Sequence, residues 1–209
     1  MTKKGILLII SGFSGTGKGT VINELISKYG DEYSLSVSAT TRAPREGERE
    51  GIEYFFKTTE EFELMISNNE LIEYACYVKN YYGTPRKYVE EQLLKGKNVI
   101  LEIEIQGALD VKKLYPESVL IFLLPPDIAE LERRLKGRGS ESREVISERL
   151  CRAVTEVDSA YKYDYIVIND DLNNCCTSVN NIVKAEKFSV KRNIDAIDKI
   201  KSELKGSYA

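Results

Sequence analysis

A glycine-rich segment that follows an apolar run near the N-terminus constrains the fold of this chain more than any other feature. Residues 6–10 read ILLII, residues 11–20 read SGFSGTGKGT, and apolar residues then recur at helical spacing from Val21. A strand, a glycine loop and a helix in this order are typical of a phosphate-binding loop, because backbone N–H groups can converge on phosphate oxygens without obstruction by side chains. The sequence therefore predicts phosphate binding by Gly12, Phe13, Ser14, Gly15, Thr16, Gly17, Lys18, Gly19 and Thr20.

The residues around Lys18 decide what this loop can do. The Lys18 ammonium adds positive potential at the start of a helix, where the backbone already favours anions. The Ser or Thr that usually follows the lysine and coordinates Mg²⁺ is replaced by Gly19, and a hydroxyl comes one place later at Thr20. Direct coordination by a hydroxyl is therefore in doubt, and we expect metal contacts from Thr20 and Glu102, directly or through water.

Short apolar runs alternate with helical patterns, which is typical of an α/β fold with a parallel sheet flanked by helices. The runs cover residues 5–11, 98–105, 118–124 and 164–169. Residues 38–82 are instead polar and rich in tyrosine, with turn residues between them. Because long insertions usually carry function, we interpret this stretch as an inserted lobe.

A helical hairpin is predicted after the third apolar run. Two prolines close that run, Asp127 supplies a cap, and apolar residues recur at helical spacing up to Leu135. The segment Gly137-Arg138-Gly139 interrupts this helix, and a second one runs from residue 140 or 141 toward Val157. Two basic helices joined by glycines are typical of a mobile cover over a binding site.

These patterns divide the chain into three parts. The core takes residues 1–37, 97–125 and 158–209, the lobe takes residues 38–96, and the lid takes residues 126–157. The C-terminal part of the core has a helical pattern, with apolar residues at Val179, Ile182, Val183, Ile194, Ile197, Ile200 and Leu204.

Composition and charge exclude several classes of protein. Hydrophobic residues make up 42% of the chain and charged residues 30%, which excludes a fibrous or disordered chain. No apolar run approaches the roughly 18 residues that span a bilayer, so we expect a cytoplasmic protein without a membrane partner. The net charge of −3 leads us to expect no nucleic-acid partner.

The cysteines do not form a recognisable metal or disulfide pattern. They show no C-x-x-C spacing, and a chain without histidine has too few ligands for a conventional zinc site. We interpret them as reduced thiols that mostly serve packing: Cys76, Cys151, Cys175 and Cys176.

Several motifs strongly resemble the guanylate kinase family. They are VSATTRAPREGE at 37–48, GIEYFF at 51–56, Glu73, NYYGT at 80–84, QGA at 106–108, GRG at 137–139 and INDD at 168–171. The matches occur in family order and cover most of the chain. The resemblance implies a P-loop nucleoside monophosphate kinase fold with a GMP-binding lobe and a helical lid. It also implies reversible transfer of the γ-phosphoryl group of ATP to GMP or dGMP, with Mg²⁺.

Two arginines suit the phosphate of a nucleoside monophosphate. Arg42 and Arg45 flank a segment that Pro44 holds extended, so their guanidinium groups can converge on one doubly charged phosphate. Two arbitrary arginines would more often be solvated surface charges, but the neighbouring threonines and the family match favour phosphate binding. Tyr54 and Tyr82 look like further phosphate donors, although isolated tyrosines more often pack in partly buried sites.

Carboxylates suit the guanine base. A carboxylate can accept hydrogen bonds from guanine N1–H and N2–H at once, whereas it repels the N1 acceptor of adenine. The resemblance places Glu73 at this contact and makes Glu104 a second candidate for N2–H, although an isolated glutamate would more often be exposed. Ser38 and Thr84 fit as hydroxyl donors to guanine O6.

Glu102 and Glu104 stand two apart in a run that reads LEIEI, so strand alternation would place both on one face. There they would hold Mg²⁺ or the guanine base, or form the solvated face of a half-exposed strand. The division of these roles between the two glutamates stays open.

Phosphoryl transfer needs positioned charge rather than a strong base. The attacking GMP phosphate has a second pKa of about 6 and is largely ionised at neutral pH, so a chain without histidine can carry out the reaction. Closure of the lid would exclude water. Asn169 is expected at the adenine or as a helix cap. The resemblance assigns charge compensation to Lys18, Arg42, Arg134, Arg138 and Arg149.

Three other functions compete with this one. A kinase for another monophosphate is disfavoured by Glu73 together with Ser38. A catalytically inactive binding module of the guanylate-kinase-like type would lack a working phosphate loop, and a GTPase switch would need an Asn-Lys-x-Asp motif, which the sequence lacks. We therefore expect ATP and GMP as small-molecule substrates of a monomer or a homodimer.

Overall fold

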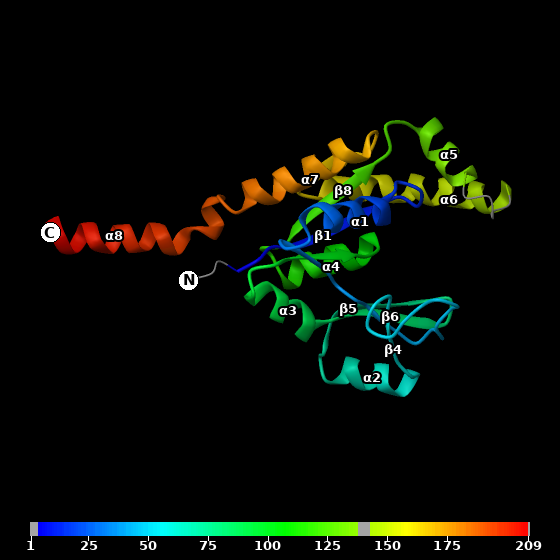
Figure 1. Cartoon of the computed structure of the whole chain (residues 1–209), viewed down its shortest axis with the longest axis horizontal. Coiled ribbons are helices and arrows are strands. Elements are labelled where there is room, and N and C mark those ends of the chain that lie inside the picture. The colour runs from blue at the N-terminus through cyan, green and yellow to red at the C-terminus, as the bar shows by residue number, and fades with distance from the viewer. Residues whose placement is uncertain (1–3, 138–142, 209) are drawn as a thin grey trace.

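The computed structural model describes residues 4–137 and 143–208, which form two separate sheets (Figure 1). The larger sheet has the strand order β2-β7-β1-β8-β9, and each neighbouring pair is parallel. This confirms the α/β class and the parallel core sheet predicted from the sequence. Its strands are β1 (Leu7–Gly12), β2 (Tyr33–Leu35), β7 (Asn98–Glu102), β8 (Val119–Leu124) and β9 (Tyr165–Ile168).

Both faces of this core sheet are covered by helices. Leu8 and Ile10 of β1 lie in one apolar layer with residues of α1 and α7, whereas Leu7 and Ile9 lie in the opposite layer with residues of α3 and α4. Because neither face of β1 meets solvent, this strand is apolar throughout rather than alternating. The four helices are α1 (Lys18–Tyr29), α3 (Arg86–Leu94), α4 (Ile105–Leu114) and α7 (Leu172–Glu186).

The smaller sheet is mixed and has its own small core. Its order is β4-β3-β6-β5, with β3 parallel to β4 and β6 antiparallel to both β3 and β5. Helix α2 (Thr59–Ser67) begins at a capping box of Thr58 and Glu61 and buries Phe62 beside Leu71. The strands are β3 (Ala39–Thr40), β4 (Phe55–Phe56), β5 (Leu71–Tyr77) and β6 (Asn80–Pro85).

The predicted helical hairpin is present in the described residues. Helix α5 (Ile128–Lys136) begins at Asp127, whose carboxylate accepts a hydrogen bond from the Glu130 backbone N–H at 2.7 Å, so the predicted cap is confirmed. Helix α6 (Arg143–Glu156) continues into η1 (Val157–Lys162). Arg138, Gly139 and the predicted start of the second helix lie outside the described residues.

Two strand predictions need correction. The run at residues 98–105 is too long, because β7 ends at Glu102 and Glu104 already serves as the N-cap of α4. The alternation argument therefore does not apply to Glu102 and Glu104, since only the first of them belongs to the strand. The edge strand β2 was missed because its three residues are too few to show a period.

The packing prediction for the cysteines holds for only half of them. All four are free thiols; Cys175 and Cys176 are buried in α7, whereas Cys76 and Cys151 are exposed. The exposed pair lies on the solvent side of β5 and of α6, so it does not contribute to a core. In the part of the chain that the structure describes, no helix is both long and apolar enough to span a bilayer.

After α7 the chain forms η2 (Val190–Arg192) and then α8 (Ile194–Tyr208). Figure 1 shows α8 projecting from the rest of the molecule, on the side away from the lid helices. The division into core, lobe and lid stays a prediction, although α3, which it assigns to the lobe, packs Val89 and Leu93 into the core.

Candidate active site

The phosphate loop lies between β1 and α1 and has a tightly specified backbone. Gly15 and Gly17 have φ values of 93° and 87°, which lie in the left-handed region that favours glycine. A Cβ atom on Gly17 would also lie 2.7 Å from Nδ2 of Asn169, so the position excludes a side chain twice over. Gly17 is the N-cap of α1, and the loop therefore leads straight into the positive end of that helix.

A buried hydrogen-bond frame holds the loop in place. The Thr16 hydroxyl donates to the Phe13 carbonyl at 2.9 Å, and the Asn169 amide donates to the Thr16 carbonyl at 2.8 Å. Arg134 of α5 donates to the Asn169 carbonyl at 2.8 Å and to that of Thr16 at 3.3 Å. Helix α5, the loop and the segment after β9 thus share one network.

The capping alternative for Asn169 is wrong. Asp171 is the N-cap of α7, and its carboxylate accepts a hydrogen bond from the Asn174 backbone N–H at 2.9 Å. Asn169 lies two residues earlier, with its side chain buried and turned toward the loop.

Lys18 and Glu102 lie next to each other beside the first turn of α1. The Lys18 ammonium donates to the Gly12 carbonyl at 2.7 Å and to the Phe13 carbonyl at 3.2 Å. Desolvation raises the pKa of the Glu102 carboxyl, while the charge of Lys18 opposes that rise. A Cβ atom on Gly19 would lie 3.9 Å from a Glu102 oxygen, and the neighbouring Thr20 is exposed.

Helix α6, which belongs to the predicted lid, also reaches the loop. Arg149 of α6 donates a hydrogen bond to the Ser14 hydroxyl. Arg134 and Arg149 therefore approach the same loop from two helices. Arg138, the third predicted lid cation, lies outside the described residues.

An arginine–aromatic cluster lies in the smaller sheet. The Arg42 guanidinium donates to both Glu48 carboxylate oxygens, at 2.8 and 3.0 Å, and lies 5.4 Å from the centre of the Tyr54 ring. The Tyr54 and Tyr82 rings pack edge to face with centres 6.0 Å apart. Three of the predicted phosphate ligands are therefore gathered, together with a glutamate that the sequence interpretation had not singled out.

Glu48 connects this cluster to the predicted fourth ligand. Its carboxylate accepts a hydrogen bond from the Arg45 backbone N–H at 2.8 Å, while the Arg45 side chain is exposed. The bonds from Arg42 and Arg45 hold the pKa of the Glu48 carboxyl below its usual range. The only sequence signal for Glu48 was its place within the motif at residues 37–48.

A second carboxylate lies between the smaller sheet and α4. Glu73 of β5 accepts a hydrogen bond at 2.7 Å from the hydroxyl of Thr84, which is 1% exposed. A Cβ atom on Gly107 of α4 would lie 3.1 Å from a Glu73 oxygen, so this glycine leaves room for the carboxylate. Burial raises the pKa of Glu73, and the bond from Thr84 opposes that rise.

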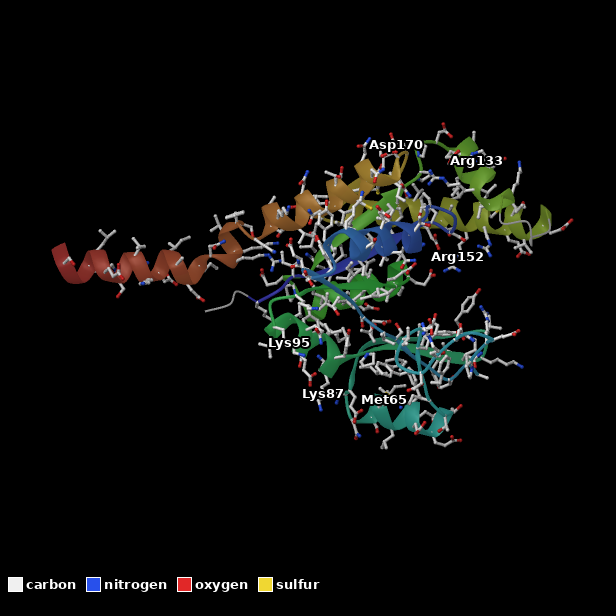
Figure 2. All side chains as sticks on the ribbon, in the orientation of Figure 1. Met65, Lys87, Lys95, Arg133, Arg152 and Asp170 are labelled. Carbon is white, nitrogen blue, oxygen red and sulfur yellow. The ribbon has the colours of Figure 1, made fainter. Side chains whose placement is uncertain are left out.

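Two other predicted guanine ligands make their contacts with residues other than Glu73. Ser38 is half buried just before β3, and its carbonyl accepts a hydrogen bond from the Phe55 N–H at 2.9 Å. Glu104 is exposed and pairs at 2.8 Å with Arg152 of α6, on the side of the lid that faces the smaller sheet (Figure 2). Sequence reasoning missed this pair, since nothing in the spacing connects residues 48 positions apart.

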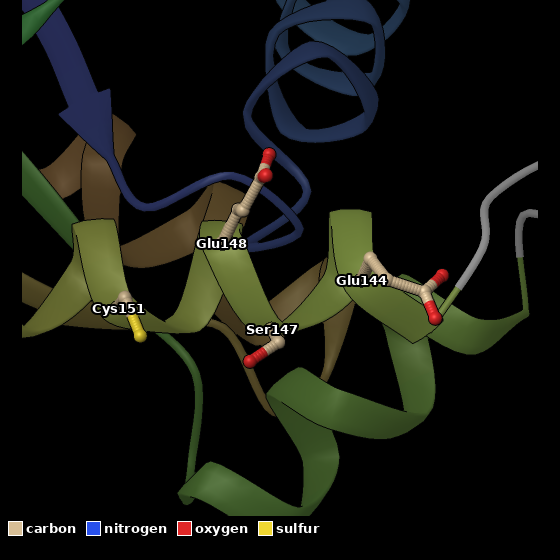
Figure 3. A pocket seen from close by; sticks show the side chains of 4 residues that line it. All are labelled: Glu144, Ser147, Glu148 and Cys151. Atoms are coloured by element: carbon tan, nitrogen blue, oxygen red, sulfur yellow. The ribbon is translucent and has the colours of Figure 1, made fainter.

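A surface hollow on α6 differs in kind from these groups. Its lining residues follow helical i, i+3, i+4 and i+7 spacing and all come from one helix (Figure 3). Because no second element contributes to it, the hollow lacks convergent polar groups of the kind found at the loop and at Glu73. The lining residues are Glu144, Ser147, Glu148 and Cys151.

Comparisons with known proteins by family model, by sequence and by structure all find the same family. Residues 4–186 match the family described as guanylate kinase. A guanylate kinase of Streptococcus thermophilus is 52% identical over 192 residues, which are 92% of each chain, and one of Streptococcus pyogenes is 49% identical over 208 residues, 100% of this chain and 99% of its own. The crystal structure of guanylate kinase from Anaplasma phagocytophilum is similar with a TM-score of 0.72 and 35% identity, covering 91% of this chain and 90% of that one.

Proposed function

The chain belongs to the guanylate kinase family and phosphorylates GMP to GDP with ATP, and from this premise we propose how its side chains divide the work. The phosphate loop binds the phosphates of ATP, and the cluster around Arg42 binds the phosphate of GMP. Glu73 recognises the guanine. The partly buried, hydrogen-bonded Glu73 carboxylate carries this proposal, since a carboxylate placed between a sheet and a helix needs donors such as those of guanine.

We assign the ATP phosphates to the loop and to the cations around it. Loop N–H groups and the Lys18 ammonium would bind the β- and γ-phosphates in place of the Gly12 and Phe13 carbonyls. Arg134 and Arg149 already contact the loop from the lid and would stabilise the charge of the transferred phosphoryl group, with Arg138 as a third cation. Asn169 acts mainly by holding the loop and would meet the adenine only at its edge.

The residues near Lys18 fit a Mg²⁺ ion that arrives with ATP. Over residues 4–137 and 143–208, no three acidic, cysteine or histidine side chains form a metal cage. Mg²⁺ at a nucleotide is held mainly by phosphates and water with one or two protein oxygens, and Glu102 and Thr20 can supply these. When bound, the ion neutralises charge on the phosphates.

We assign the GMP phosphate to Arg42 and Arg45, with the hydroxyls of Tyr54 and Tyr82 as further donors. One terminal nitrogen of the Arg42 guanidinium donates to both Glu48 oxygens and the other donates to the Ala43 carbonyl at 2.7 Å, so the guanidinium is held in place and its remaining N–H groups would bind the acceptor phosphate. This phosphate is largely ionised at neutral pH and attacks the γ-phosphorus in line, without a protein base. The side chains thus orient two anions that would otherwise repel each other.

At the base, Glu73 would accept N1–H and N2–H while Thr84 and Ser38 would donate to O6. Glu104 would reach N2–H only after leaving Arg152, so we rank it behind Glu73. None of these contacts involves the ribose 2′ position, so we expect dGMP to be phosphorylated as well. Closure of α5 and α6 over the site would exclude water and suppress ATP hydrolysis.

The test compares Glu73→Gln with wild type in a coupled ADP-release assay with GMP, dGMP, AMP, CMP, UMP and dTMP. Gln retains an acceptor for Thr84 but presents an amide to two guanine donors, so kcat/KM for GMP should fall by about 10²-fold. Because burial raises the pKa of Glu73, its ionised form costs stability at neutral pH, and Gln should leave the melting temperature unchanged or higher.

Glu63→Gln is the matched control, since Glu63 is exposed on α2 in the same lobe, and its kinetics should equal those of wild type. Full GMP activity in Glu73→Gln would remove Glu73 from the guanine site. If the wild-type enzyme phosphorylated every acceptor in the panel equally well, the proposed recognition of guanine would be contradicted as a whole.

A further inference from the structure

Helix α8 carries an apolar stripe that no other described element covers. Its members follow helical spacing and are each 51–55% exposed: Ile194, Ile197, Ile200 and Leu204. The helix projects from the body and lies beyond residue 186, where the match to the family ends (Figure 1). A continuous exposed stripe of this kind marks an interaction surface rather than scattered surface residues.

The segment at residues 186–193, here called the joint, fixes the start of α8 through hydrogen bonds to α7 and the core sheet. The carboxylate of Glu186, which is 8% exposed, accepts hydrogen bonds from the Tyr165 hydroxyl at 2.6 Å and from Arg192 at 3.3 Å. Lys191 adds an ion pair with Glu186 at 3.5 Å. These contacts tie η2 to the end of α7 and to β9 of the core sheet.

The residue before α8 completes the joint. The Asn193 amide donates to the carbonyls of Lys187 at 3.0 Å and Ser189 at 2.8 Å. Arg192 also donates to the Glu117 carbonyl, on the core side. The direction of α8 is thus set by several hydrogen bonds, so the chain holds the apolar stripe out at a defined angle.

We propose that the apolar stripe of α8 binds the same stripe of a second copy of this chain, with the two helices antiparallel. A twofold axis perpendicular to two antiparallel helices places the same flank of each helix opposite itself. The flank beside the stripe carries Asp198 and Lys201, both exposed. Antiparallel pairing centred near residue 199 therefore sets Asp198 against the partner's Lys201, and the reverse pair follows by symmetry.

The same register matches the apolar residues. It sets Ile194 against the partner's Leu204 and brings the two central turns together at Ile197 and Ile200. The C-terminal turn of the partner's α8 then lies alongside Val190 at the joint, which is 70% exposed. The stripe is thus complementary to itself in its apolar residues, and the flank beside it is complementary in charge at Asp198 and Lys201.

A lipid surface fits this helix less well. The charged side chains of α8 balance, with three acidic residues against three lysines, whereas helices that bind anionic membranes are rich in basic residues. The acidic members are Asp195, Asp198 and Glu203, and the basic ones are Lys199, Lys201 and Lys205.

The first test is sedimentation velocity on the full chain at roughly 1 to 300 μM, because an interface of one short helix pair predicts micromolar affinity. We expect wild type to shift from monomer to dimer over this range. Ile197→Glu places a charge at the centre of the stripe and should abolish the dimer while leaving GMP phosphorylation unchanged. A wild-type monomer at every concentration overturns the proposal, as does an Ile197→Glu dimer as tight as wild type.

Charge exchange tests the orientation. Asp198→Lys and Lys201→Asp each turn two attractive pairs into two repulsive ones and should weaken association about tenfold, whereas the double variant should recover it to within about twofold. Asp195→Lys is the matched control, since Asp195 lies on the opposite side of the helix and should not change association. A double variant weaker than both single ones, or a control weakened as much as Asp198→Lys, overturns antiparallel pairing.

Vesicles of phosphatidylcholine with phosphatidylglycerol distinguish the lipid alternative. A dimer that stays off these vesicles in a flotation assay supports pairing between two copies. A wild-type chain that remains monomeric and floats with the vesicles, in a manner lost in Ile197→Glu, overturns it.

Discussion

The two nucleotide sites that we propose for this protein are built in different ways. The proposed ATP side is one continuous segment whose backbone conformation is fixed by left-handed glycines, by a buried bond from Asn169 to the Thr16 carbonyl and by a partly buried bond from Arg134 to the same carbonyl. The GMP side is assembled from side chains on separate segments, with Arg42 held by Glu48 and Glu73 held by Thr84. The first site depends on main-chain geometry, and the second depends on side-chain chemistry.

This difference predicts that substitutions in the two sites affect stability and activity differently. A substitution that adds a side chain to the loop should disturb the fold and turnover together, because loop and frame share buried hydrogen bonds. A substitution of Arg42, Glu48 or Glu73 should change recognition of GMP with a smaller effect on stability, because each of these side chains is only partly buried. Lys18 is the exception on the ATP side, since its ammonium acts as a side chain.

Lys18→Ala should produce the largest effect. The ammonium is the cation nearest to the transferred group in the proposed site, and loss of one transition-state donor costs about 10²- to 10³-fold in kcat. Alanine suits the first turn of α1, so the melting temperature should stay close to that of wild type. Steady-state kinetics and thermal unfolding measured on the same sample check both expectations.

Lys28→Ala is its control, because Lys28 lies in the last turn of α1 and pairs with Glu24 away from the loop. It should retain wild-type turnover. Retention of activity in Lys18→Ala would show that the Lys18 side chain is not needed for turnover and would contradict its assignment to the phosphates.

Gly17→Ala should cost stability as well as activity. Alanine at a φ of 87° costs about 1–2 kcal/mol, and its Cβ would lie 2.7 Å from the Asn169 amide that holds the loop. A loss of about 2 kcal/mol lowers the melting temperature of a chain of this size by about 4–8 °C, which calorimetry would detect.

Gly206→Ala is the matched control for this backbone effect. A Cβ atom on Gly206 would meet no atom within 4 Å, and the residue lies in α8, where alanine is the better helix former. We expect an unchanged or slightly raised melting temperature. Equal damage in both variants would show that the loop tolerates a side chain no worse than an open helix does.

The sequence could predict the strand, the glycine loop and the helix around Lys18 because the information for them is local. The glycines, Lys18 and the apolar run before them are adjacent, so the strand, loop and helix follow from spacing alone. The cap at Asp127 and four of the core strands were predicted for the same reason. The three residues of β2 were too short to show a pattern, and its pairing with β7 is a contact across more than 60 positions.

The contacts of the GMP side and of the frame could not be predicted from spacing. Asn169 reaches Thr16 across 153 positions, and Glu104 pairs with Arg152 beyond the end of β7, which comes three residues earlier than the apolar pattern suggested. Glu48 lay inside a quoted motif, but its bond to Arg42 depends on a turn whose shape the sequence did not specify. Composition and periodicity are local, so they carry no signal for a residue whose partner comes from a distant segment.

Glu48→Gln should produce the smallest effect and tests the idea that GMP-side residues act by positioning. The amide loses charge-assisted bonds to Arg42 and to the Arg45 N–H, so the guanidinium would be held less firmly. We expect the KM for GMP to rise about two- to fivefold, with kcat, the KM for ATP and the melting temperature unchanged. Initial rates over a grid of both substrates measure each constant.

The pH dependence sharpens this last prediction. Arg42 and the Arg45 N–H hold the pKa of Glu48 below its usual range, so the carboxylate is ionised at neutral pH and the pairing is lost only as pH falls through that lowered pKa. The ratio of KM values between Glu48→Gln and wild type should therefore stay constant from about pH 6 to pH 9. Glu46→Gln, at an exposed neighbouring position, should match wild type. A rise in the KM for ATP instead would show that the arginine cluster serves both nucleotides, and the two sites would then not be built independently.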